Sequence, residues 1–193
     1  MPTACRLSQT LGLMKSAIPT SESQEFASRV LKVNHAGENG AVNIYAGQIF
    51  FARITAPRMV AELFEFKSHE EKHRAIFWAE LQLRNRPRCR GFWLCGIGGF
   101  MLGLITGAFG RRAIAATTVA VERVVLRHLE QQLDQLRGKD EAAVKAIESI
   151  VTEERQHHDQ SASHITVGQF WPKVLSPIVS ASTEAVIWVG MRA

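Results

Sequence analysis

Apolar residues lie in long stretches that rarely alternate with period two, which predicts helices rather than strands. Proline and basic or glycine-containing segments separate these stretches. We expect helices over residues 24–52, 58–84, 111–137 and 140–164, an uncharged apolar segment at 91–110, and a last apolar segment at 178–190. The pattern therefore predicts an all-α fold.

The chain has 193 residues, enough for one domain with a well-buried core. Residues 1–22 contain no continuous apolar stretch of the kind that a secretory signal needs, so we expect a flexible leader, with a short transit peptide as the alternative. Residues 23–193 are expected to form the single domain.

Two Glu-x-x-His sequences each follow a lone glutamate by 32 residues, as if one helix pair had been duplicated. A Glu and a His three positions apart lie on one face of a helix and can present both side chains to one point. One glutamate from each of two helices and a Glu-x-x-His from each of two more form the ligand set of di-iron carboxylate bundles. In chain order the six residues are Glu38, Glu70, His73, Glu122, Glu154 and His157.

The neighbours of the lone glutamates Glu38 and Glu122 are mostly small or apolar. A carboxylate on an apolar helix face is unfavourable unless it is paired or bound to metal, and mixed oxygen and nitrogen ligation suits iron or manganese. Each Glu-x-x-His alone is weak support, because charged pairs at this spacing are common on solvated helices. The repeated interval favours a metal site over that alternative.

The apolar segment 91–110 is long enough to span a bilayer. One crossing between His73 and Glu122 would put the two halves of the metal site on opposite sides of the membrane, and both flanks are basic. We therefore expect a segment that lies on a membrane without crossing it. The alternative is a buried core helix.

The formal net charge of +5 suits an anionic membrane surface or an anionic cosubstrate. Nucleic acid is a weaker interpretation, because the chain has neither an aromatic-basic RNA signature nor zinc-finger spacing. The cysteines, Cys5, Cys89 and Cys95, are odd in number and lack a Cys-x-x-Cys spacing, so we expect free thiols and no cysteine metal ligands.

Several blocks of sequence resemble the demethoxyubiquinone hydroxylase family of ubiquinone biosynthesis. The similarity covers about residues 29–190. The residues that carry it are Arg29-Val30, Asn34-His35-Ala36-Gly37-Glu38, Gly40-Ala41, Ile44-Tyr45, Gly47-Gln48, Glu70, His73, Thr118-Val119-Ala120-Val121-Glu122, Glu154, His157-His158-Asp159 and Ala185-Val186-Ile187-Trp188.

The resemblance implies a ferritin-like four-helix bundle with an additional membrane-interacting segment and a C-terminal helix. It would lie peripherally on the inner membrane, at the bacterial cytoplasmic face or the mitochondrial matrix face. The implied activity is hydroxylation of a benzoquinone ring with a polyprenyl tail, using dioxygen and electrons from NADH. A lipid-binding partner protein is implied by the family alone, and an oligomer is compatible with the sequence.

Carried over residue by residue, the resemblance implies six ligands for two iron ions: Glu38, Glu70, His73, Glu122, Glu154 and His157. Glu70 or Glu154 would bridge the two ions. The same six residues are therefore the expected catalytic centre. This chain has Leu129 where the family usually has tyrosine, so an electron relay through that position does not carry over. No Gly-x-Gly-x-x-Gly pattern marks a nicotinamide site.

Two rival functions remain open on the sequence. One is another activity of a di-iron bundle, such as ferroxidase or hydroxylation of a different substrate. The other is a metal-free helical protein that associates with membranes. For His128 the alternatives are a position beside the metal ligands or a polar core residue, and for Asp159 a hydrogen bond to a ligand imidazole or an exposed surface position.

Overall fold

The structure is a computed structural model that describes residues 21–166, 168 and 170–192. The helices are α1 (Ser21–Thr55), α2 (Val60–Leu83), α3 (Phe92–Ala108), α4 (Arg111–Leu136), α5 (Glu141–Ala162) and α6 (Phe170–Gly190), with a short 3-10 helix, η1 (Pro57–Met59), before α2. The described residues contain no strand, so the predicted all-α fold is confirmed. The expected leader lies outside the described residues except for Ser21 and Glu22, which begin α1.

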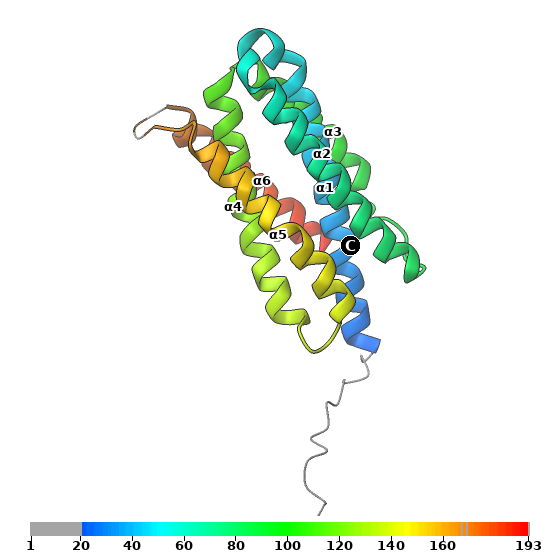
Figure 1. Ribbon diagram of the computed structural model, residues 1–193. Coiled ribbons are helices and arrows are strands. Elements are labelled where there is room, and N and C mark those ends of the chain that lie inside the picture. The colour runs from blue at the N-terminus through cyan, green and yellow to red at the C-terminus, as the bar shows by residue number, and fades with distance from the viewer. Residues whose placement is uncertain (1–20, 167, 169, 193) are drawn as a thin grey trace, which may run out of the picture.

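The long helices α1, α2, α4 and α5 form a bundle, and the two most apolar helices lie against it (Figure 1). Helix α1 packs against both α2 and α3, while α4 packs against α5 and α6. The α1–α2 and α4–α5 pairs are each joined by a short connection, as the duplicated pattern predicts. Helix α3 is the link that leads from the first pair to the second (Figure 1).

The apolar core is divided into two clusters along the bundle. One contains Leu31, Phe77, Leu133 and Ile147, and the other contains residues such as Ile49, Met59, Phe66 and Ile114. On α1, α2 and α4 the candidate ligands fall between the positions that build the two clusters. The fold thus places six polar side chains in a layer with an apolar cluster on each side.

Helix α3 lies very close to α1 because its contact face is glycine. A Cβ built on Gly99 would be 2.3 Å from the carbonyl oxygen of Gly40, and one on Gly103 would be 2.1 Å from that of Ile44. Phe92, the first residue of α3, is buried, but most of the large side chains that follow are exposed: Trp93, Leu94, Ile97, Phe100, Met101, Ile105 and Phe109, just after its last turn. The alternative of a buried core helix is therefore wrong.

Within the described part of the chain, no helix combines the length and the apolar character that crossing a bilayer requires. Helix α3 has 17 residues and is therefore shorter than the apolar segment 91–110 that the sequence predicts.

The two cysteines of the described residues are free thiols. Cys89 lies before α3 and Cys95 lies in its first turn.

The last helix begins earlier than the sequence predicts. The two prolines, Pro172 and Pro177, predict that the last helix begins at residue 178, but α6 begins at Phe170 and contains Pro177. Pro172 lies in the first turn, where a missing N–H has no intrahelical partner to lose. Pro177 interrupts one hydrogen bond of a helix whose packing against α4 supplies other stabilisation.

Candidate metal centre

The six predicted ligands come together in the middle of the bundle, and each of its four helices contributes at least one of them. Helix α1 contributes Glu38 and α4 contributes Glu122, while α2 and α5 each contribute a glutamate and a histidine. All six side chains are buried. The residues that the sequence pattern singles out therefore share one site, and their role as ligands remains a prediction.

The side chains form two groups, each suited to one metal ion. Ligand atoms of Glu38, Glu70, His73 and Glu154 lie within 4.8 Å of one another, as do those of Glu70, Glu122, Glu154 and His157. Glu70 and Glu154 belong to both groups. Two cation positions that share two carboxylates are the arrangement of a dinuclear carboxylate site.

Both imidazoles turn the same nitrogen toward the shared carboxylates. His73 Nδ1 is 2.9 Å from Glu154 Oε1 and 3.7 Å from Glu70 Oε2. His157 Nδ1 is 3.1 Å from Glu70 Oε1 and 3.8 Å from Glu154 Oε2. The Nδ1 atoms are thus the ones available to a cation.

Several of these atoms lack a hydrogen-bond partner although they are buried. They are both carboxylate oxygens of Glu70, Glu154 Oε1, and Nδ1 of His73 and His157. The short distances between them do not have hydrogen-bond geometry. Buried polar atoms are normally paired, so a cluster of unpaired oxygen and nitrogen donors that face one another fits divalent cations.

The far nitrogen of each imidazole is held by a residue that the sequence did not single out. His73 Nε2 is 2.7 Å from Glu153 Oε2, and His157 Nε2 is 3.0 Å from His69 Nδ1. Such contacts orient an imidazole and leave its other nitrogen free to bind metal. A signal was available, because Glu153 and His69 each directly precede a predicted ligand.

Tyr45 closes the site on the side of the second group. Its hydroxyl donates to Glu122 Oε1 at 3.2 Å, and its ring packs edge-on against Phe66. Phe66 also lies 4.4 Å from His157 between ring centroids. Both rings are themselves buried, so this side of the ligand cluster packs against aromatic side chains.

Burial and crowding of carboxylates govern protonation in this cluster. The pKa values of Glu38 and Glu122 are raised well above the usual range, first by burial and then by the neighbouring carboxylates. Burial would lower the His73 pKa, but the nearby Glu154 and Glu70 raise it to about 10. Burial would raise the pKa of Glu70, but His157 and His73 lower it. Divalent cations would displace the protons that otherwise balance this charge.

The other residues weighed on the sequence lie elsewhere. His128 Nε2 is 2.8 Å from Glu184 on α6, and burial and Arg127 lower its pKa. Asp159 is 72% exposed and contacts the neighbouring His158, which agrees with the surface alternative. Leu129 is buried in the apolar cluster of Leu133 and Ile147 and so occupies an ordinary core position.

Comparison with known proteins shows the family of this chain. The family model "Ubiquinone biosynthesis protein COQ7" matches residues 25–190, a range that contains all six candidate ligands. The chain belongs to the COQ7 family. The predicted resemblance is thereby confirmed.

Relatives within the COQ7 family carry closely related names. The chain is 37% identical over 169 residues to the 3-demethoxyubiquinol 3-hydroxylase of Rhodospirillum rubrum, covering 85% of this chain and 77% of the relative. It is 30% identical over 176 residues to the NADPH-dependent 3-demethoxyubiquinone 3-hydroxylase, mitochondrial, of Homo sapiens, covering 88% and 79%. The mouse protein of the same name is 30% identical over 170 residues, covering 85% and 76%.

Proposed function

We propose that this protein is a di-iron monooxygenase that hydroxylates the benzoquinone ring of a demethoxyubiquinone or its quinol in ubiquinone biosynthesis. Its relatives carry the names of hydroxylases of this substrate. The observation that carries the proposal is the pair of four-residue ligand groups that share Glu70 and Glu154. Sharing of carboxylates suits two iron ions, which the six side chains would hold between four helices.

The reaction inserts one oxygen atom of dioxygen into the ring and reduces the other to water, which requires two electrons and two protons. Bound iron would supply the redox chemistry with dioxygen. The electrons are proposed to come from a reduced nicotinamide. Several relatives are named NADPH-dependent, whereas the family resemblance implies NADH. The experiment below therefore compares the two donors.

The chain's own residues prepare the site for this chemistry. Glu153 and His69 hold the Nε2 atoms of His73 and His157, which keeps both Nδ1 atoms directed at the shared carboxylates. Tyr45 fixes one oxygen of Glu122, and with Phe66 it keeps water from that side of the cluster. The side chains of the site are thereby oriented and buried before substrate arrives.

The exposed apolar surface of α3 supports a peripheral location on an inner membrane. We define this surface by the outward side chains of Trp93, Leu94, Ile97, Met101 and Ile105. A polyprenyl quinone resides in the bilayer, so an enzyme that rests on the membrane through this surface could receive its substrate there. The partner protein and self-association stay predictions.

The test is the mass of the product. The purified, iron-loaded full chain is incubated with isotopically heavy dioxygen, a short-tailed demethoxyquinone, and NADH or NADPH in parallel. We expect the quinone to gain one heavy oxygen atom. A sample that holds iron but adds no oxygen to the quinone, and instead consumes dioxygen only while oxidising added ferrous iron, would replace the proposal with ferroxidase activity.

A further inference from the structure

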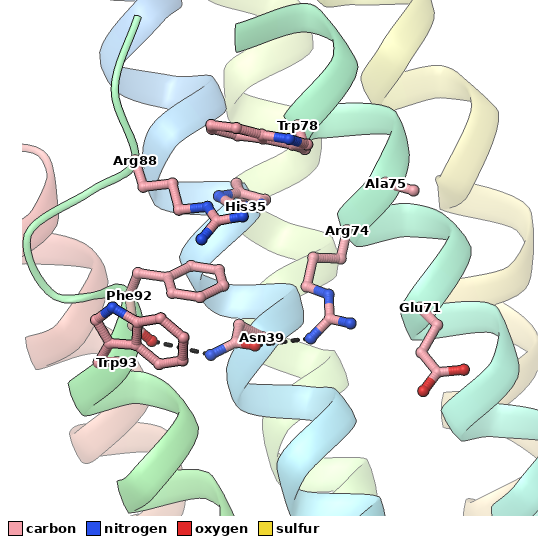
Figure 2. Close-up of a pocket in the computed structure, with 9 residues that line it drawn as sticks. All are labelled: His35, Asn39, Glu71, Arg74, Ala75, Trp78, Arg88, Phe92 and Trp93. Carbon is pink, nitrogen blue, oxygen red and sulfur yellow. Dashed lines mark hydrogen bonds between the residues drawn. The ribbon is translucent and has the colours of Figure 1, made fainter. Parts of the chain in front are cut away.

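A second site lies next to the metal centre, where α1, α2 and the start of α3 meet. It is a pocket of about 350 Å³ lined by residues that include His35, Arg74, Trp78, Arg88, Phe92 and Trp93 (Figure 2). None of these side chains belongs to the six candidate ligands. Two cationic and three aromatic side chains in one pocket suggest a ligand that is both anionic and partly apolar.

The two guanidinium groups of the pocket are held in place by neutral partners. The Arg88 guanidinium carbon is 4.5 Å from the ring centre of Trp78 and 4.9 Å from that of Phe92. Arg74 Nη1 donates to Asn39 Oδ1 at 2.7 Å, and Asn39 Nδ2 donates to the Phe92 carbonyl at 3.0 Å (Figure 2). Aromatic faces and an amide position these cations without neutralising them.

The positive charges of Arg74 and Arg88 are not neutralised by a carboxylate among the described residues. Among the described residues, neither Arg74 nor Arg88 forms an ion pair with a carboxylate. Glu71 also lines the pocket, but its carboxylate is 2.5 Å from Lys67 Nζ. The pocket therefore offers positive charge to a ligand.

His35 adds a buried polar atom to the same pocket. Its ring is only 2% exposed and is stacked between Trp78 and Phe92, at centroid distances of 5.3 and 4.7 Å. Its Nδ1 has no hydrogen-bond partner. Burial, with Arg88 and Arg74, lowers the pKa of His35 to about 4, so the ring is neutral at neutral pH. His35 is therefore a fixed, neutral part of the aromatic wall of the pocket.

The apolar surface of α3 begins at the edge of this pocket. Trp93 lines the pocket and is also the first large exposed side chain of α3, followed by Leu94 and Ile97. A molecule whose anionic group contacts Arg74 and Arg88 could therefore continue along the apolar side chains of α3. Guanidinium groups bind phosphate in paired, charge-assisted hydrogen bonds.

We propose that this pocket binds the phosphate group of an anionic glycerophospholipid, whose acyl chains lie along the α3 surface. Such a lipid would hold the start of α3 at a fixed depth in the membrane interface. Because Asn39 follows Glu38 and Arg74 follows His73, the bound lipid would lie at the same level along α1 and α2 as the metal centre. This lipid site is separate from the hydroxylase proposal and can be tested without turnover.

The first experiment uses the intact chain and dihexanoyl phosphatidylglycerol, kept below the concentration at which it forms micelles so that no charged surface contributes. Binding is measured by calorimetry and by tryptophan fluorescence, with glycerol 3-phosphate and dihexanoylglycerol in parallel. We expect the phospholipid to bind at least about tenfold more tightly than either fragment, because it combines charged and apolar contacts. Equal binding of glycerol 3-phosphate would make this a free-phosphate site, equal binding of dihexanoylglycerol a purely apolar one, and each would overturn the proposal.

Variants then locate the lipid site. Arg88→Gln and Arg74→Gln should each weaken phospholipid binding about tenfold, as expected for hydrogen bonds to a charged group. Arg90→Gln makes the same change of charge at an exposed arginine outside the pocket lining and should leave binding unchanged. Equal weakening by all three variants would contradict a defined site. If a pocket variant fails to fold, as judged by circular dichroism, the comparison of the three ligands on the unmodified chain still decides the proposal.

Discussion

Glu70 and Glu154 face each other across the bundle, and each lies closest to the histidine of the other's helix. Glu154 Oε1 is 2.9 Å from His73 Nδ1, and Glu70 Oε1 is 3.1 Å from His157 Nδ1. This exchange links α2 to α5 and makes both carboxylates members of both ligand groups. Glu38 and Glu122 each belong to one group only. The two classes of glutamate should therefore respond differently to substitution.

Replacement of one unshared glutamate should remove one metal position. We expect Glu122→Ala to reduce bound iron from about two ions per chain to about one, and to lower hydroxylation more than about 100-fold, while membrane association is unchanged. Glu154→Ala should lose both ions. The matched control is Glu130→Ala, because Glu130 lies on α4 like Glu122 but is exposed and paired with Arg155. This variant should keep iron and activity. Retained turnover in Glu122→Ala would refute the ligand assignment.

The contact between His69 and His157 should matter for metal affinity. Without an acceptor 3.0 Å from its Nε2, His157 loses the contact that orients Nδ1 toward the cluster. We expect His69→Leu to weaken iron binding about 10- to 100-fold, and His69→Asn, whose amide oxygen can replace the ring acceptor, to restore most of it. Iron retained against a graded chelator measures both variants. Equal loss in both would show that ring packing, rather than the hydrogen bond, is what His69 provides.

The sequence predicted the parts of this site that follow from helical geometry. A glutamate and a histidine three positions apart, such as Glu70 and His73, share a helix face. The duplicated interval of 32 residues predicts that each pair lies level with the lone glutamate of the preceding helix. The same geometry explains the position of His128. Six residues are about one and two-thirds turns, so His128 leaves the face of Glu122 and reaches α6.

Other features depend on how helices meet, which one sequence does not specify. The glycines of α3 allow a close helix contact, but glycine alone does not specify that α1 is the partner. Contacts of His69 and Glu153 require the relative rotation of α2 and α5, although both residues adjoin predicted ligands. The sequence does not predict the start of α6 at Phe170, because proline usually breaks a helix, whereas Pro172 occupies a tolerated first-turn position.

Arg84 and Asp140 should make stability depend on acid. Asp140 accepts from Arg84 at 2.6 and 2.9 Å and from the Ala143 backbone N–H at 3.0 Å, so it joins α2 to the first turn of α5. The Arg84 hydrogen bonds lower the Asp140 pKa below its usual value. A lowered folded-state pKa gives stability that is present above the unfolded-state value, near 4, and is lost as the pH falls through the folded-state value.

Substitutions separate the two roles of Asp140. Asp140→Asn keeps a helix-capping oxygen but loses the charge, and we expect a loss of about 2 kcal/mol in the free energy of unfolding at pH 7. Asp140→Ala should lose about 1 kcal/mol more, because the cap is also removed. Urea denaturation from pH 7 to pH 3 should show less acid dependence in Asp140→Asn than in the unmodified chain. An unchanged acid dependence would contradict this role.

The glycine contact between α3 and α1 offers a comparison of adjacent residues. A Cβ on Gly99 would meet the Gly40 backbone, whereas one on Gly98 would meet nothing within 4 Å. We expect Gly99→Ala to lower the free energy of unfolding by about 1–3 kcal/mol, because two helix backbones must separate. Gly98→Ala should be neutral or stabilising by up to about 1 kcal/mol, since alanine favours helix. Equal effects in denaturant titrations would mean that the two helices are not in such close contact.

The apolar surface of α3 should determine membrane association. Ile97 is 65% exposed on this surface, so Ile97→Glu introduces a charge where we propose the bilayer lies. We expect a loss of about 2 kcal/mol of binding free energy, about thirtyfold in affinity for vesicles of anionic phospholipid, with iron content and helicity unchanged. Leu83→Glu is the control, because Leu83 is 78% exposed on α2 and lies outside the α3 surface. Sedimentation with vesicles measures both, and similar losses in the two variants would mean that general surface charge, rather than insertion of α3, governs binding.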